Sequence, residues 1–525
     1  MKNENKIKTI MQEHPEKRDK LYARGFLFTD DKVNDKQYPF YNIWKRAEIG
    51  KYVLLVAAEQ QYYIYDNNNL FFILIGHAYN PFSMSYDEKE ILSVLAEQQY
   101  LSDGFWDKFN QLTGIFTLIM VRDNEIYVVG DPTCMQSVYY GQVNNHIYIS
   151  SHTNLLGSLL NLEVDSYIER LRNYRFFSML GNSLPGNLSQ FKDIYRLIPN
   201  HYLYIEGMEK IRVKRFYWPI SLQIKEKKLL DDIISIMKAN MLLISQKWKK
   251  PAISMTGGCD SKTTLACTEG LYDKFSYFSY ISSESEKVDA EAAHTICEKI
   301  GLTHKIYTIP EDDTSYPNIE QVRTILEWNT GDIIPVNKND VRKRAFFAER
   351  NDFDVEVKSW VSEIGRAYYS KRFNGRKNFD TMPTPRKCTT LYKFFLHNRK
   401  LVRETDEVFK EYLNNYFEQA GENPVAWQEQ FFWEFRMASW NGGVITGEHK
   451  YSFDITIPYN NRKLLELLIS VSLEERINDS VYRKIRTQLN PAIDETGIFI
   501  TNLKHTKRRE KLEDLYYFMH SNFKF

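Results

Sequence analysis

The stretch that decides the fold is ISMTGGCDSKTTLA, residues 253–266. Apolar and small residues lead into Thr256, two glycines, a cysteine, an aspartate and Ser261, and a run typical of a helix follows. Because glycine has no Cβ, Gly257 and Gly258 let backbone N–H groups come close to an anion. The helix adds the positive end of its dipole, and the two hydroxyls add hydrogen-bond donors. The turn is therefore predicted to bind the phosphates of a nucleotide.

The aspartate inside this turn, Asp260, would be repelled by a bound phosphate unless a cation lay between them. We therefore expect Asp260 to bind Mg²⁺. Taken alone, the residues are also compatible with a Gly-Gly turn that carries an exposed aspartate. The GxxxxGK[ST] spacing of a Walker A loop is absent, which argues against a kinase or a GTPase.

The segments around the turn alternate between strands and helices. Strands are expected at 251–255, 275–281 and 304–309, a helix from the turn to about 270, and a helix at 286–300. In the latter helix, Val288, Ala292, Ile296 and Ile300 are predicted to form one apolar face. This order predicts a doubly wound parallel sheet, whose ligands bind beyond the carboxyl ends of the strands.

The first half of the chain has a different pattern. Three pairs of β-rich runs surround the turns Asp66–Asn69, Arg122–Glu125 and Asn144–Asn145, which predicts antiparallel hairpins. Helices are expected at 86–100 and 153–162, and residues 1–40 look polar and irregular. The pattern changes around 216–224, so we expect an α+β domain at 1–220 and an α/β domain at 221–525.

Composition limits the classes of protein that fit. The net charge is +1, which gives no global attraction to nucleic acid or to an anionic membrane. The five cysteines contain no CxxC pair, so neither disulfides nor a zinc site are expected. The longest apolar run, 70–75, is far shorter than the roughly 20 residues of a bilayer span. We expect a cytoplasmic enzyme without a nucleic-acid or membrane partner.

TGGCDS resembles the SGGxDS pyrophosphate loop of ATP pyrophosphatases, which cleave ATP to AMP and pyrophosphate while adenylating a substrate. LTGIFTLIMVRDNEIYVVGDPTCMQSVYYG (112–141) resembles part of the glutaminase-like domain of asparagine synthetases. FDITIPYNNRKLLELLISVSLEERINDSVYRKI (453–485) resembles part of their synthetase domain. The resemblance implies an N-terminal-nucleophile-like antiparallel αββα domain, then a doubly wound parallel-sheet ATP-pyrophosphatase domain with a helical C-terminal part. It also implies ATP and Mg²⁺ as cofactors.

The chain departs from this family at the glutaminase nucleophile. A glutaminase of this type needs a cysteine at the mature N-terminus, but residue 2 is Lys and the first cysteine is Cys134. Glutamine hydrolysis is therefore not expected. In this respect the chain resembles the β-lactam synthetases and lasso-peptide cyclases, in which an amine of the substrate is the nucleophile.

The resemblance also implies roles for residues of the synthetase half. The S-G-E-G-x-D-E motif corresponds to Val361–Ala367, so Glu363 matches the family acid and is predicted to accept the amine's proton. A surface glutamate is the alternative. Arg366 takes the place of a metal-binding aspartate and is expected to contact phosphate instead. At 458–461, Pro-Tyr-Asn-Asn has lost the family's acid.

A basic cluster, LKHTKRREK (503–511), lies near the end of the sequence. By resemblance, Lys504 is the candidate for a lysine that faces the negative charge of the transition state. A solvated charge run explains the same residues equally well.

Other polar residues have simpler explanations. Asp289 and Glu291 are expected to lie at a helix start, where the helix dipole favours them. His294 and His304 are expected to be packed or surface histidines rather than ligands. The aromatic segment 427–443 is expected to be a core helix, with its two glycines bordering an acceptor pocket.

These features lead to one main hypothesis and two others. The main one is an AMP-forming amide ligase, acting on a small-molecule or peptide substrate with a carboxylate and an amine. The sequence is compatible with a homodimer but does not decide the oligomeric state. The second is a non-catalytic nucleotide-binding scaffold, suggested by the changes at positions 366 and 461. A tRNA-thiolating enzyme would need a basic surface and a cysteine pair, and neither is evident.

Overall fold

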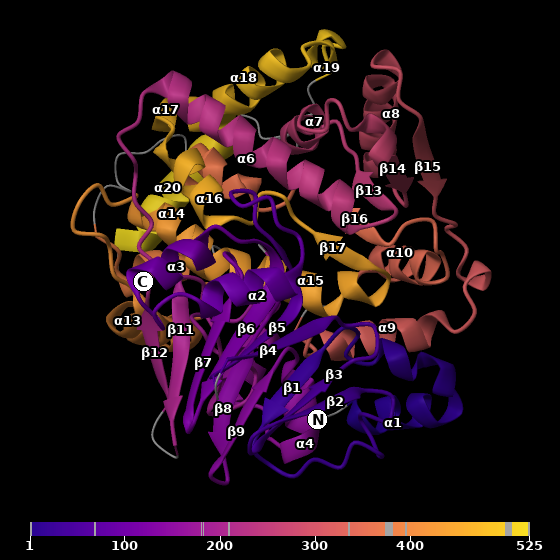
Figure 1. Cartoon of the computed structure of the whole chain (residues 1–525), viewed down its shortest axis with the longest axis vertical. Coiled ribbons are helices and arrows are strands. Elements are labelled where there is room, and N and C mark those ends of the chain that lie inside the picture. The colour runs from indigo at the N-terminus through magenta and orange to yellow at the C-terminus, as the bar shows by residue number, and fades with distance from the viewer. Residues whose placement is uncertain are drawn as a thin grey trace.

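The computed structural model describes residues 3–67, 70–179, 181, 183–207, 211–333, 336–372, 382–393, 396–498 and 507–522, with no side chains described at 507–510. The antiparallel part lies at one end of the molecule and the parallel sheet at the other (Figure 1). Among the described residues, no helix combines the length and apolar character needed to cross a bilayer.

The first half forms two six-stranded antiparallel sheets, with strand orders β10-β8-β9-β1-β3-β2 and β12-β11-β7-β6-β5-β4. The predicted hairpins are confirmed as β4–β5, β6–β7 and β8–β9, although Asn68 and Asn69 lie outside the described residues. The strands are β1 Phe26–Thr29, β2 Lys45–Ile49, β3 Tyr52–Val56, β4 Tyr62–Asn67, β5 Leu70–Tyr79, β6 Thr113–Arg122, β7 Glu125–Gly130, β8 Tyr139–Val143, β9 His146–Ser150, β10 Ile194–Arg196, β11 His201–Glu206 and β12 Arg212–Arg215.

Helices accompany these strands. The predicted helices at 86–100 and 153–162 are confirmed as α2 and α4. The helices of this half are α1 Glu4–Glu13, α2 Glu88–Ala96, α3 Asp103–Asn110, α4 Thr153–Leu160 and α5 Ser166–Arg172.

The prediction that residues 1–40 are irregular was wrong. This segment contains α1 and β1. Helix α1 buries Ile7, Ile10 and Met11, and β1 pairs with both β3 and β9. Three apolar side chains on an otherwise polar helix are enough to attach it to the core.

The second half contains the predicted parallel sheet, with strand order β15-β14-β13-β16-β17. Strands β13 Pro251–Ser254, β14 Ser276–Ile281 and β15 His304–Thr308 lie where they were expected, and β16 Val355–Val357 and β17 Asp454–Thr456 complete the sheet. Helices α6 Glu226–Lys247, α7 Cys259–Ala266 and α8 Glu284–Lys299 pack around it (Figure 1). The predicted face of α8 is partly wrong, because Val288 is 58% exposed.

The remaining chain is largely helical. The segment 427–443 is core, as predicted, but its centre is a π-helix, η6. The elements are α9 Ile319–Asn329, α10 Lys338–Ala348, η4 Ser362–Arg366, α11 Tyr368–Arg372, α12 Pro385–Tyr392, α13 Arg399–Tyr416, α14 Trp427–Phe431, η6 Phe432–Gly442, α15 Gly443–Gly447, α16 Arg462–Ser470, α17 Leu473–Ile477, α18 Ser480–Leu489, α19 Ala492–Glu495 and α20 Lys507–Asn522.

A hydrogen-bonded joint connects the two halves, and we call it the domain joint: Asn460 and Asn461 with Thr113, Asp131 and Thr133. The Asn460 amide donates to the Asp131 carboxylate at 2.8 Å and accepts from the Thr133 hydroxyl at 2.7 Å. Asn461 donates to Thr113 Oγ1 at 2.9 Å and also caps α16. Asn460 and Asn461 thus take part in the packing between the antiparallel part and the parallel part of the molecule.

Candidate active site

A cavity of about 830 Å³ lies at the carboxyl ends of β13, β14 and β16. Segments far apart in sequence line it, among them the turn Thr256–Ser261, the helix η4 and residues 477–479. This is the place where a doubly wound sheet binds its ligands. The cavity is of ordinary size for a nucleotide or another small ligand.

The turn is held by its own side chains. Ser261 Oγ accepts the backbone N–H of Thr256 at 3.0 Å, and Thr256 Oγ1 accepts that of Gly258 at 3.2 Å. A Cβ on Gly258 would lie 3.1 Å from Thr256 Oγ1, which is tighter than usual contact. Helix α7 begins at Cys259, so its N-terminal end faces the cavity. All the residues predicted to bind the cofactor in this turn line the cavity.

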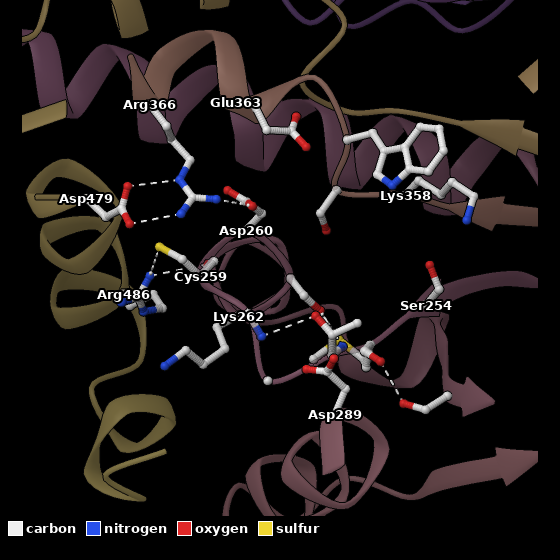
Figure 2. Close-up of a pocket in the computed structure, with 18 of the residues that line it drawn as sticks. Ser254, Cys259, Asp260, Lys262, Asp289, Lys358, Glu363, Arg366, Asp479 and Arg486 are labelled. Carbon is white, nitrogen blue, oxygen red and sulfur yellow. Dashed lines mark hydrogen bonds and ion pairs between the residues drawn. The ribbon is translucent and has the colours of Figure 1, made fainter. Parts of the chain in front are cut away.

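Asp260 has a protein cation as its partner. Arg366 donates through Nη1 to Asp260 Oδ2 at 2.5 Å. Its Nε and Nη2 both donate to the Asp479 carboxylate at 2.9 Å, and Lys371 donates to Asp479 at 2.6 Å. Figure 2 shows the guanidinium lying between the two carboxylates. Although burial opposes it, Asp260 and Asp479 raise the pKa of Arg366 well above its usual value.

These residues do not fit a protein-held Mg²⁺ well. Mg²⁺ takes oxygen ligands at about 2.0–2.1 Å in an octahedron, but one oxygen of Asp260 already contacts a guanidinium. The other oxygen, Oδ1, is buried and has no hydrogen-bond partner within the described part of the chain. No group of three or more His, Cys, Asp or Glu that could hold a metal occurs among the described residues. Metal binding at Asp260 stays a prediction that this geometry disfavours.

Glu363 faces the same cavity from η4 (Figure 2). Burial, and then the charge of Asp260, raise the pKa of its carboxyl to about 7. Its Oε2 is buried and makes no hydrogen bond to any residue that the structure describes. A carboxyl that titrates near neutral pH and keeps a free oxygen is suited to general base catalysis.

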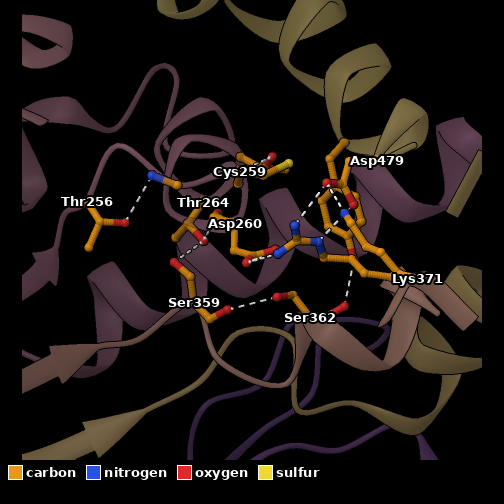
Figure 3. Close-up of polar contacts among 12 residues, drawn as sticks. Thr256, Cys259, Asp260, Thr264, Ser359, Ser362, Lys371 and Asp479 are labelled. Atoms are coloured by element: carbon orange, nitrogen blue, oxygen red, sulfur yellow. Dashed lines mark hydrogen bonds and ion pairs between the residues drawn. The ribbon is translucent and has the colours of Figure 1, made fainter. Parts of the chain in front are cut away.

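Helix η4 is held in place by contacts with α7, α16 and α18. Thr264 Oγ1 and Ser359 Oγ lie 2.7 Å apart, and Ser362 Oγ donates to the Ser359 carbonyl at 3.0 Å (Figure 3). The Tyr482 hydroxyl donates to the Ser362 carbonyl at 2.9 Å. A Cβ on Gly365 would lie 2.8 Å from both Leu468 Cβ and Tyr482 Oη. The glycine of the SEIGR stretch therefore allows the helix to pack closely.

Several site residues were missed or misread in the sequence. Asp289 was expected at a helix start, but α8 begins at Glu284, so Asp289 lies beyond its first turn and lines the cavity. Burial raises the pKa of Asp289, and the backbone N–H of Gly257 opposes this. The helical spacing of the sequence could have placed Asp289 beyond the first turn only if the start of α8 had been predicted correctly.

A buried ion network behind the turn was also missed. Lys262 donates to Asp494 at 3.0 Å and to the Ile498 carbonyl at 2.9 Å. Arg486 donates to Asp494 at 2.9 Å and to Thr263 Oγ1 at 2.9 Å. These contacts attach α7 to α18 and α19. In the sequence, Lys262, directly after TGGCDS, was the one residue that could have suggested this ion network.

Other expected residues lie elsewhere. Lys504 lies outside the described residues. His304 is buried, with Nε2 2.9 Å from Ser279 Oγ. Gly442 packs against the N-terminal half, since a Cβ there would lie 2.4 Å from the Cys134 carbonyl oxygen. Neither Gly442 nor Gly443 lines the described cavity.

No protein-family model matches the chain, and no curated protein matches its sequence. Similar solved structures include glutamine PRPP amidotransferase from B. subtilis complexed with ADP and GMP, 11% identical, covering 77% of this chain and 90% of that one, with a TM-score of 0.25. A structure described as the allosteric regulatory enzyme of purine biosynthesis is 10% identical, with 77% and 89% coverage and a TM-score of 0.25.

Glutamine-dependent NAD⁺ synthetase from Acinetobacter baumannii, in complex with ADP, is 14% identical over 35% of this chain and 38% of that one, with a TM-score of 0.18. At such scores these likenesses carry no argument. The assignment of function below is based on the residues of this chain.

Proposed function

We propose that this protein is an ATP-dependent ligase that forms an amide through an acyl-adenylate. A substrate carboxylate oxygen attacks the α-phosphorus of ATP, and the bond to the β-phosphate breaks to release pyrophosphate. An amine nitrogen then attacks the acyl carbon, the carbon–oxygen bond to AMP breaks, and the amine's proton passes to Glu363. Atoms and charges balance without a further reactant.

The turn and the guanidinium support nucleotide binding. Helix α7 begins at Cys259, which lines the cavity, and the start of a helix attracts anions through its N–H groups and its dipole. Arg366 adds a permanent positive charge. Because only three of its five N–H groups bind Asp260 and Asp479, two remain for phosphate oxygens.

The observation that carries the proposal is the Glu363 carboxyl. It combines a pKa of about 7, a buried oxygen without a described partner, and a place in the same cavity as the turn Thr256–Ser261. A structural role alone would not require an unpaired buried oxygen, because such an atom costs stability.

Glu363→Gln tests this role, because it keeps the size of the side chain and removes its basicity. ATP–pyrophosphate exchange with the carboxylate substrate should survive in this variant. Amide formation should fall by roughly 10²–10⁴-fold, the usual contribution of a positioned general base. If exchange and amide formation fall together, Glu363 serves ATP binding and the assignment of the base is wrong.

A second function, nucleotide binding without catalysis, is favoured by one observation. The Asp260–Arg366–Asp479 ion pairs already neutralise the turn, as in a site that has become structural. This reading predicts that ATP binds but that no carboxylate supports pyrophosphate exchange or AMP formation. Calorimetric binding of ATP together with a nucleotide product assay separates the two functions.

A further inference from the structure

Asp260 belongs to a set of ion pairs whose charges balance without a metal ion. Arg366 and Lys371 supply two positive charges, and Asp260 and Asp479 supply two negative ones, in one connected set of ion pairs. Asp479 holds Arg366 through both of its oxygens, so the guanidinium is fixed in the cavity wall. Although burial opposes it, Arg366 and then Lys371 lower the pKa of Asp479.

An aspartate beside a bound phosphate needs a cation between the two negative charges, and a divalent ion is the usual expectation. A guanidinium in this position can take that role. It separates Asp260 from an incoming anion and keeps N–H donors of its own for that anion. A metal on the remaining oxygen of Asp260 would share one carboxylate with a fixed positive charge, and the two cations would repel each other.

We infer that Arg366 is the resident cation of this site and that the protein binds a nucleoside triphosphate without holding a metal ion through Asp260. The inference deepens the proposed function and rests on its nucleotide assignment. Asp479 holds Arg366, and Lys371 pairs with Asp479 beside it. Both are therefore positioning residues, which act on the phosphates through Arg366.

Mn²⁺ is the probe for the first experiment, since its binding to the full chain can be followed by the loss of free-ion EPR signal without nucleotide. The wild type should show no Mn²⁺ site tighter than about 1 mM. Arg366→Asp, which places a second carboxylate beside Asp260, should gain a site at least about tenfold tighter. Arg366→Gln should gain a weaker one, and it replaces the first variant if that one does not fold. Arg366→Lys, which keeps the charge, is the matched control.

Calorimetric titration of ATP, with excess EDTA or with Mg²⁺, is the second experiment. The wild-type Kd should change by less than about threefold between the two conditions, whereas that of Arg366→Asp should become strongly Mg²⁺-dependent. A stoichiometric Mn²⁺ site in the wild type that Asp260→Asn removes would overturn the inference, even with an active ligase. An ATP affinity that collapses in EDTA would overturn it too.

The two proposals fail in different ways. If ATP does not bind under either condition, the nucleotide assignment and this inference about nucleotide binding are both wrong, whatever Mn²⁺ does. If ATP binds equally with EDTA and with Mg²⁺ but no acyl-adenylate forms, the inference stands and the ligase proposal fails.

Discussion

The domain joint and the cavity both bury polar side chains, but they treat them in opposite ways. In the joint, the Asp131 carboxylate accepts the backbone N–H groups of Thr133, Met135 and Gln136 as well as the Asn460 amide. In the cavity, Asp260 and Glu363 each keep a buried oxygen without a described partner. The joint is built for stability, and the cavity retains groups that a ligand can satisfy.

This contrast separates two changes that look alike in the sequence. Arg366 and Asn461 both stand where the resemblance noted in the sequence implies an acid. At 461 the asparagine joins a satisfied network that connects the sheets. At 366 the arginine lines the cavity and brings a positive charge beside Asp260. Variants in the joint should therefore change stability, and variants in the cavity should change chemistry.

The largest effect is expected for Asp260→Ala. Loss of this carboxylate removes one of the two acids that position Arg366, and a misplaced charge-stabilising donor costs about 10²–10³-fold. ATP–pyrophosphate exchange should fall by that amount, measured with labelled pyrophosphate. Asp352→Ala is the control, because Asp352 pairs with Lys305 on the surface. An unchanged exchange rate in Asp260→Ala would remove Asp260 from the site.

The joint should show a large effect on stability instead. Asn460→Ala leaves the Thr133 hydroxyl and the Gly114 carbonyl without this partner. At about 1–3 kcal/mol for each such group, the free energy of unfolding should fall by about 2–6 kcal/mol in urea titrations. Asn5→Ala, in an exposed position of α1, should change little. A loss of ATP affinity without a loss of stability would contradict the division of roles.

A smaller effect is expected for Gly365→Ala. The added Cβ would meet Leu468 and Tyr482 at 2.8 Å and push η4 toward the cavity. Overpacking of this kind costs about 1–3 kcal/mol, and both pyrophosphate exchange and amide formation should fall, because η4 carries Arg366 as well as Glu363. Gly421→Ala is the control, since the described structure places nothing within 4 Å of its Cβ. Unchanged rates of both half-reactions in Gly365→Ala would show that the position of η4 matters to neither.

The smallest effect is expected in the pH dependence of amide formation and of stability. Since the pKa of Glu363 is raised to about 7, its base form increases as pH rises through that value. Amide formation should fall by about tenfold for each pH unit below 7, and Glu363→Gln should lack this limb. Stability has the opposite sign, because the raised pKa disfavours the ionised folded state. Compared with Glu363→Gln, the wild type should lose stability as pH rises from 4.5 to about 7.

Local sequence patterns predicted most of the secondary structure and the arrangement of the sheets. The alternation of apolar residues and the Asn/Asp turns predicted the hairpins, and the strand–turn–helix order around 253–266 predicted the parallel sheet. Strand β1 was not predicted from the sequence. It has only four residues, and all are buried because the strand pairs with a neighbour on each side, so they show no alternation of apolar and polar residues. The signal of such a short strand comes from its neighbours in space rather than from the sequence around it.

The site was only partly predictable for a similar reason. The turn and Glu363 could be found because each belongs to a short motif. The partners of Arg366 could not, because Asp260 and Asp479 lie more than 100 residues away in either direction along the chain. Only the folded arrangement of α7, η4 and α18 shows that the arginine opposes carboxylates as well as facing a cavity.

The identity of the nucleotide product tests the central claim most directly. The full-length protein, incubated with ATP and panels of amino acids, hydroxy acids and short peptides, can be followed by chromatography of the nucleotides and by labelled-pyrophosphate exchange. The account predicts AMP and pyrophosphate with at least one carboxylate, and their loss in Asp260→Ala. Release of ADP and phosphate, or ATP binding without turnover for every carboxylate, would contradict it.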